Sequence, residues 1–251
     1  MNLPFETLPF LFFVIAFVYS MVGFGGGSSY LLVLTLAGLS HTQSVPIALL
    51  CNLVVTGVGF WGFVRAGYFN WRLALPFSVL SVPMAFLGAK IPIGKELFLF
   101  LLAFSLALAA LRILFLRDGV TLPLPGFNGK KAWIYGLPIG GIIGFFSGLI
   151  GLGGGIFLSP ILILTRWAQV RQASAAACFF IFINSLSGLA GKLHEGLTLP
   201  DNLVLYMVPA FLGGVAGSWL GTRRVSSAAL GRVLAFLTLF VSINLFIKLF
   251  A

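Results

Sequence analysis

Long apolar runs, separated by short polar or glycine-rich stretches, fill almost the whole chain. A helix that crosses the hydrocarbon core of a bilayer needs about 20 apolar residues, and the interruptions recur at about that interval. The runs with the length of one full crossing are residues 44–64, 73–89, 97–116, 173–191, 202–220 and 230–250. We therefore expect each of these runs to form a transmembrane helix.

Two further apolar regions, residues 4–39 and 132–164, are each broken by glycines. The first contains Gly23-Phe24-Gly25-Gly26-Gly27 and the second contains Gly151-Leu152-Gly153-Gly154-Gly155. Each region is too long for one crossing, and its second arm (28–39 or 156–164) is too short for a full one. This pattern predicts a hairpin or broken helix that turns inside the membrane. Non-helical backbone is tolerated there only where protein or a water-filled cavity surrounds it.

The two glycine pentads indicate an internal duplication. Both have the pattern G-x-G-G-G, and they lie about 128 residues apart. Each is followed by a short apolar arm, a polar connection, a helix with small and polar residues, and two more helices. A period this long is typical of two half-transporters. The predicted units are residues 1–116 and 132–251, joined by a linker at 117–131 that contains Pro123, Pro125, Gly126 and Gly129.

The basic residues predict how these halves are oriented. If each broken region returns to its starting side, one side of the membrane receives Arg65, Arg72, Arg117, Lys130, Lys131, Arg166, Arg171, Arg223, Arg224 and Arg232. The other side receives Lys90, Lys95, Lys192 and Lys248, with Glu6, Glu96, Glu195 and Asp201. The positive-inside rule makes the first side cytoplasmic and places both termini outside. The expected fold is an all-α integral membrane protein of two inverted repeats, each a Gly-broken helical hairpin followed by three transmembrane helices.

Composition excludes several other classes of protein. The chain is 60% hydrophobic and 8% charged, against about 45–50% and 25% in soluble proteins. Its net charge of +10 comes from scattered basic residues, which does not indicate a nucleic-acid surface. Cys51 and Cys178 lie in no metal-binding spacing, and His41 and His194 have no partner ligands. We therefore expect no metal and no cofactor. The chain contains neither HExxH nor GxSxG, so we do not expect an enzyme.

The pentads are the strongest candidates for a binding site. Glycine permits positive φ, so successive N–H groups can converge on an anion. The helix that starts after each pentad adds the partial positive charge of its N-terminus. The candidate residues are Gly25, Gly26, Gly27, Ser28 and Ser29 in the first half, and Gly153, Gly154 and Gly155 in the second. The alternative is that these glycines only allow close helix packing in lipid.

Polar side chains inside the predicted crossings extend this site. Asn52, Asn184 and Ser185 can donate hydrogen bonds to oxyanion oxygens, although such residues also serve as hydrogen-bonding contacts between membrane helices. No Asp or Glu lies in the middle of a predicted crossing. This argues against a cation substrate and against a carboxylate proton relay.

With these motifs in place, the chain resembles the TauE/SafE family of sulfite and organosulfonate transporters. The resemblance covers about residues 8–250, and its motifs are the two pentads, the stretch from Arg65 to Pro76 and the segment from Phe182 to Gly188. It implies a bacterial inner-membrane carrier for small sulfur-containing anions such as sulfite, thiosulfate or sulfonates. The expected partners are this anion and the lipid bilayer, and a homodimer is left open. An anion channel is the main alternative, and an intramembrane enzyme or a membrane scaffold are weaker ones.

Overall fold

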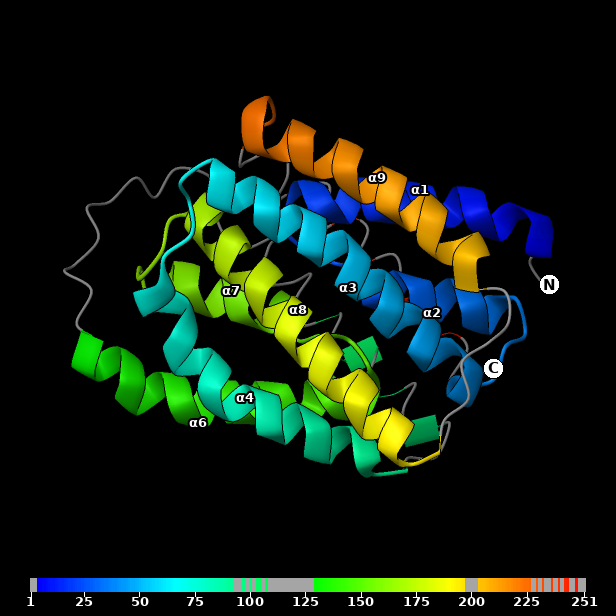
Figure 1. Cartoon of the computed structure of the whole chain (residues 1–251), viewed down its shortest axis with the longest axis horizontal. Helices are drawn as coiled ribbons and strands as arrows, with labels where there is room; N and C mark the ends of the chain where they lie inside the picture. The colour runs from blue at the N-terminus through cyan, green and yellow to red at the C-terminus, as the bar shows by residue number, and fades with distance from the viewer. Residues whose placement is uncertain are drawn as a thin grey trace.

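The computed structural model describes residues 4–92, 129–196 and 203–226 continuously, with single residues between 96 and 107 and between 229 and 247. The expected crossings at 97–116 and 230–250, and residues 117–128 of the expected linker, lie outside the continuous ranges. The secondary structure of the described part is helical (Figure 1). In chain order its elements are η1 (Phe5–Thr7), α1 (Leu8–Met21), α2 (Gly27–Leu36), α3 (His41–Arg65), α4 (Trp71–Lys90), α6 (Gly129–Ile150), α7 (Gly155–Leu164), α8 (Val170–His194) and α9 (Leu203–Arg223).

The helices α3, α4, α6, α8 and α9 are long and apolar enough to cross a membrane. Four of them coincide with the predicted crossings at 44–64, 73–89, 173–191 and 202–220. The fifth, α6, is the first arm of the broken region 132–164, and its 22 residues are about 33 Å long at the usual helical rise. The second broken region is therefore one full-length helix followed by the short arm α7.

The central helices α3 and α8 begin in the same way. Ser40 and Gln43 form a capping box before α3, in which the Ser40 N–H donates to Gln43 Oε1 over 3.1 Å. Gln169 and Gln172 do the same before α8, also over 3.1 Å. Both boxes satisfy backbone N–H groups that a helix start leaves without partners.

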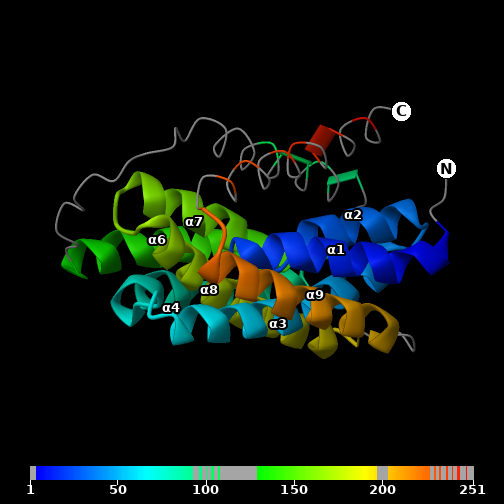
Figure 2. The ribbon, with the colours of Figure 1, turned by 90° about the horizontal axis from the view of Figure 1, so that it is seen from above.

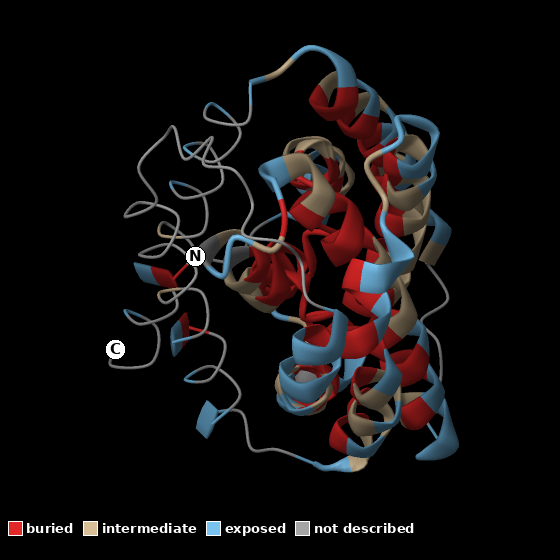
Figure 3. Ribbon diagram, turned by 90° about the vertical axis from the view of Figure 1, so that its left-hand side faces the viewer, coloured by how far each residue is buried: buried red, intermediate tan, exposed pale blue. Residues whose placement is uncertain are grey.

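The bundle is built around α8. Of the most apolar stretch of α8, 72% is buried, compared with 33% for α9. The helix α3 packs on α8, with α4 against α8 and α9 against α3, while α6 packs on α4 and α1 on α9. Figure 2 shows α2 and α7 along one side of the bundle and α3 and α4 along the other. Buried residues fill the space between the helices, and the outward faces are exposed (Figure 3).

Two of these contacts are made by glycines one helical turn apart. On α6, Gly136, Gly140, Gly144 and Gly148 face the backbone of α4. On α9, Gly213, Gly217 and Gly221 face the backbone of α1. Small residues let membrane helices approach closely, so these two pairs pack backbone against backbone. Large apolar side chains such as Ile142 and Val204 point outward, where lipid would solvate them.

Candidate functional site

The fourth residue of each glycine pentad is left-handed and immediately precedes a short helix. Gly26 has φ of +89° and precedes α2, while Gly154 has φ of +76° and precedes α7. Both short helices have 10 residues, about 15 Å of helix, which is too little to cross a bilayer. Neither start has a side-chain cap.

These two starts leave backbone donors without acceptors. The N–H groups of Ser29 and Tyr30 both donate to Gly26 O over 3.0 Å, and the Phe157 N–H donates to Gly154 O over 3.1 Å. Among the described residues, nothing accepts a hydrogen bond from the N–H groups of Gly25–Ser28 or of Gly153–Ile156. Free N–H groups at a helix start carry partial positive charge. The interior of the bundle thus has two concentrations of hydrogen-bond donors.

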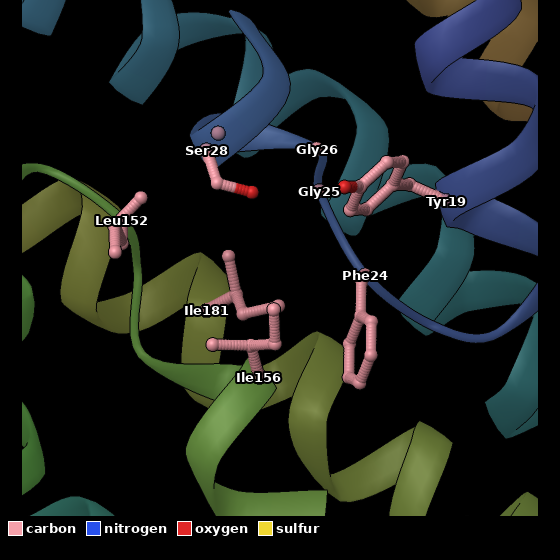
Figure 4. A pocket seen from close by; sticks show the side chains of 9 residues that line it. Tyr19, Phe24, Gly25, Gly26, Ser28, Leu152, Ile156 and Ile181 are labelled. Atoms are coloured by element: carbon pink, nitrogen blue, oxygen red, sulfur yellow. The ribbon is translucent and has the colours of Figure 1, made fainter. Parts of the chain in front are cut away.

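A small cavity of about 20 Å³ lies where the two pentads meet. Its lining consists of Tyr19, Phe24, Gly25, Gly26, Gly27, Ser28, Leu152, Ile156 and Ile181. Figure 4 shows the oxygens of Tyr19 and Ser28 directed into this space, with Leu152, Ile156 and Ile181 on the opposite side. This volume is enough for a water molecule but not for an ion of several heavy atoms. In this conformation the site is too small to hold such an anion.

Asn52 on α3 lies directly behind the first pentad. Its side chain is fully buried, and a Cβ added to Gly25 or Gly27 would overlap its amide group. Asn52 Nδ2 donates to Leu152 O over 3.4 Å, which links α3 to the second pentad. Its Oδ1 has no hydrogen-bond partner among the described residues. Glycine is therefore required at positions 25 and 27 for the amide to fit.

Ile181 on α8 stands in the same relation to the second pentad. A Cβ added to Gly153 or Gly155 would overlap the Ile181 side chain. The polar Asn52 of the first half is thus matched by an apolar side chain in the second. The cavity lining is polar at Ser28 of α2 and apolar at Ile156 of α7 and Ile181 of α8.

The structure distributes the sequence-predicted site residues over three places. Gly25, Gly26, Gly27 and Ser28 line the cavity, and Asn52 supports them from behind. Gly153, Gly154 and Gly155 adjoin it through their neighbours Leu152 and Ile156, with Ser185 Oγ beside Gly153. The other two point elsewhere. Ser29 Oγ is hydrogen-bonded to Tyr19 Oη at 2.7 Å, and Asn184 Oδ1 accepts from Ser81 Oγ on α4 over 2.8 Å.

Sequence reasoning missed three lining residues outside the pentads, Tyr19, Ile156 and Ile181, and did not single out Phe24 and Leu152 within the pentads. Tyr19 lies one helical turn before the first pentad, so its distance from Gly23 was a usable signal. Ile181 carried no such signal, because an isoleucine inside an apolar helix is typical of any membrane protein.

Comparison with known proteins places this arrangement in a family. The sequence pattern described as "Sulfite exporter TauE/SafE" matches residues 8–245. The chain belongs to the TauE/SafE family.

Curated members of related sequence are named as transporters. The chain is 30% identical over 245 residues to the probable membrane transporter protein y4hK of Sinorhizobium fredii, covering 95% of this chain and 96% of that protein. It is 28% identical to a probable membrane transporter protein of Haemophilus influenzae, over 92% and 94% of the two chains. It is 24% identical to the probable membrane transporter protein YunE of Bacillus subtilis, over 88% and 90%. No solved structure matches the chain. With its spanning-length helices, this TauE/SafE member is a multi-pass membrane transporter.

Proposed function

We propose that the protein is a secondary transporter that exports small sulfur-containing anions across the bacterial inner membrane. Sulfite, thiosulfate or an organosulfonate would bind near the midplane, at a site formed by the two Gly-rich hairpins. The observation that carries this proposal is the pair of uncapped helix starts with free N–H groups, of which the first lines the cavity and the second adjoins it through Leu152 and Ile156. Helix starts of this kind are a recurrent anion-binding device, and broken helices hold substrates at the midplane of many secondary transporters.

The chemistry of the site favours an anion over a cation. Its donors are backbone N–H groups and the hydroxyl of Ser28. The chain's acidic residues are Glu6, Glu96, Asp118, Glu195 and Asp201, and none of them belongs to the cavity lining. Neutral donors also bind an anion more weakly than a fixed cation would. Such binding suits a transporter that must release what it binds.

We further propose that residues 1–116 and 132–251 are inverted repeats joined by the linker 117–131. If each helix of α1–α4 is exchanged with its counterpart in α6–α9, the same helix contacts result. The contact of α1 with α9 becomes the contact of α6 with α4, and the contact of α3 with α8 is unchanged. The contacts of single residues follow the same exchange. Gly23 faces Ser174 on α8, and Gly151 faces Val45 on α3.

Transport by such a protein requires the site to open. The cavity of about 20 Å³ is too small for the anion in this conformation, so the anion enters only after the hairpins separate from the helices behind them. Opening alternately toward the two sides is the usual cycle of inverted-repeat carriers. A membrane potential of 100 mV, negative inside, favours the outward movement of one negative charge by about 2.3 kcal/mol. Export then needs no proton relay.

Solute binding to the purified full-length protein tests this proposal first. Sulfite, thiosulfate, sulfate, a short sulfonate and acetate are compared at one ionic strength by calorimetry and thermal shift. We expect stabilisation by at least one sulfur oxyanion and none by acetate. Ser28→Ala should weaken binding several-fold because its hydroxyl faces the cavity. Ser78→Ala, which removes a buried hydroxyl bonded to Ala74 O on α4, should leave affinity unchanged.

Transport in liposomes then separates a carrier from a channel. Efflux of the bound anion should saturate and should accelerate when the potential favours movement of negative charge in that direction. Single-channel currents carried by the same anion would replace the carrier with an anion channel. A wild-type protein that binds and transports none of these anions would overturn the sulfur-anion proposal.

A further inference from the structure

Two buried hydroxyls, outside the cavity lining, flank the start of α7. Ser147 on α6 is 1% exposed and Ser185 on α8 is 0% exposed. A Cβ on Gly154 would lie 3.1 Å from Ser147 Cβ, and a Cβ on Gly153 would lie 2.9 Å from Ser185 Oγ. The two serines therefore border consecutive residues of the second pentad, immediately before the first turn of α7.

Neither hydroxyl has a hydrogen-bond partner among the described residues. Other buried serines of the bundle do have one. Ser78 Oγ donates to Ala74 O over 2.8 Å, and Ser187 Oγ donates to Val82 O over 2.6 Å. A serine in a helix can usually satisfy its hydroxyl on the carbonyl one turn earlier, and leaving it unpaired in the interior is unfavourable. Ser147 and Ser185 thus border the pentad, and their hydroxyls have no partner among the described residues.

The same place holds the second set of free backbone donors. The N–H groups of Gly153–Ile156 have no acceptor in the described part of the chain, and α7 adds the positive end of its dipole. Hydroxyl and backbone donors therefore surround one helix start. The chemistry of this position matches a small oxyanion, with several oxygens that accept hydrogen bonds at once.

Ser147 and Ser185 lie outside the lining of the cavity at α2, although Ile156, whose N–H is one of the free donors, belongs to that lining. The Ile181 side chain does belong to the cavity lining, and this side chain also lies against Gly153 and Gly155. Ile181 therefore lies between the cavity and the second pentad.

We propose that the start of α7 is a second oxyanion position on the transport path, with the hydroxyls of Ser147 and Ser185 as ligands. This inference rests on the proposed anion transport and adds a second binding position to it. The anion occupies this second position before or after the position at α2. Passage between the two positions requires the Ile181 side chain to turn aside.

The test uses the purified full-length protein, with sulfite and thiosulfate as probes, and compares wild type with the double variant Ser147→Ala/Ser185→Ala. We expect the variant to bind the anion at least tenfold more weakly and to transport it at least tenfold more slowly. Its unfolding midpoint without anion should equal or exceed that of wild type, because the substitutions remove unpaired hydroxyls. The control Ser78→Ala should show the reverse, with a lowered midpoint and binding within twofold of wild type.

Three results would overturn this proposal in distinguishable ways. If wild type binds and transports the anion and the double variant does so within twofold of wild type, the second position is ruled out and the proposed function stands. A midpoint lowered as far as in Ser78→Ala would show that the hydroxyls are structural. A wild type that neither binds nor transports either anion would end the proposed function and this inference together.

Discussion

At the scale of single residues, the left-handed glycines set the geometry of the site. A non-glycine residue in this backbone region costs about 1–2 kcal/mol, and a β-branched side chain is disfavoured further. A Cβ on Gly26 would lie 2.7 Å from Ile15 Cγ2, and one on Gly154 would lie 2.9 Å from Ile143 Cγ2. We predict that Gly26→Val or Gly154→Val abolishes anion transport while the protein still reaches the membrane. Transport in liposomes and membrane yield measure the two effects.

Gly38 provides the matched control for these substitutions. Its φ is +88°, but a Cβ there would have no neighbour within 4 Å. Gly38→Val therefore carries the same backbone strain without the overlap and should keep most of the transport activity. Full activity of both pentad variants would contradict a role for the helix starts.

The residue scale also shows how far sequence reasoning reaches into the site. The pentads could be found because glycines cluster twice at matching positions, and their left-handed residues follow from that. Asn52 could be named as a site residue, but its contact with Leu152 could not be predicted, because the two residues are 100 positions apart in sequence. Nor does the sequence reveal that Asn184 bonds to Ser81, or that Ser147 remains unpaired.

At the scale of helices, close backbone contact holds α6 to α4. A Cβ on Gly144 would overlap Ser81 O, and one on Gly140 would overlap Phe77 O. We predict that Gly144→Leu lowers the free energy of unfolding by about 1–3 kcal/mol or more, as overpacking of a tight contact does. Thermal unfolding and size-exclusion profiles of the purified protein measure this loss. Gly129→Leu at the start of α6, where a Cβ meets nothing within 4 Å, should have little effect, and an equal loss there would contradict this packing.

The positions of the helices could be predicted from the sequence, but the packing contacts between helices could not. The run 73–89 coincides with α4 to within two residues at either end, because its length of apolar sequence is what a bilayer demands. Which helix packs on it was hidden, since lipid-facing and helix-facing positions are both apolar in a membrane protein. The glycines of α6 at every fourth position were the one readable sign of its contact face. The sequence also did not show that α6 has the length of a full crossing, because a hairpin and a broken helix both fit region 132–164.

At the scale of the whole molecule, charge separates the two ends of the bundle. Arg171 on α8 contacts the ring and hydroxyl of Tyr68 in the turn before α4, while Lys90 Nζ at the end of α4 lies 3.5 Å from Glu195 Oε1 after α8. The helices α4 and α8 therefore run side by side from one end to the other. Arginine gathers at the first end, where the turns after α3, α7 and α9 also lie (Figure 1). By the positive-inside rule, this end would be cytoplasmic.

Cysteine labelling tests this orientation, because the chain's own thiols do not interfere. Cys51 and Cys178 are buried, whereas a side chain on Gly67 or Gly196 would have no neighbour within 4 Å. Gly67 lies in the turn before α4, at the arginine-rich end, and Gly196 follows Glu195 at the opposite end. In intact cells, a membrane-impermeant maleimide should label Gly196→Cys and should reach Gly67→Cys only after permeabilisation. The reverse result would invert the molecule in the membrane and turn the α2 hairpin toward the cytoplasm. Labelling of both sites from outside would contradict a membrane-spanning α4.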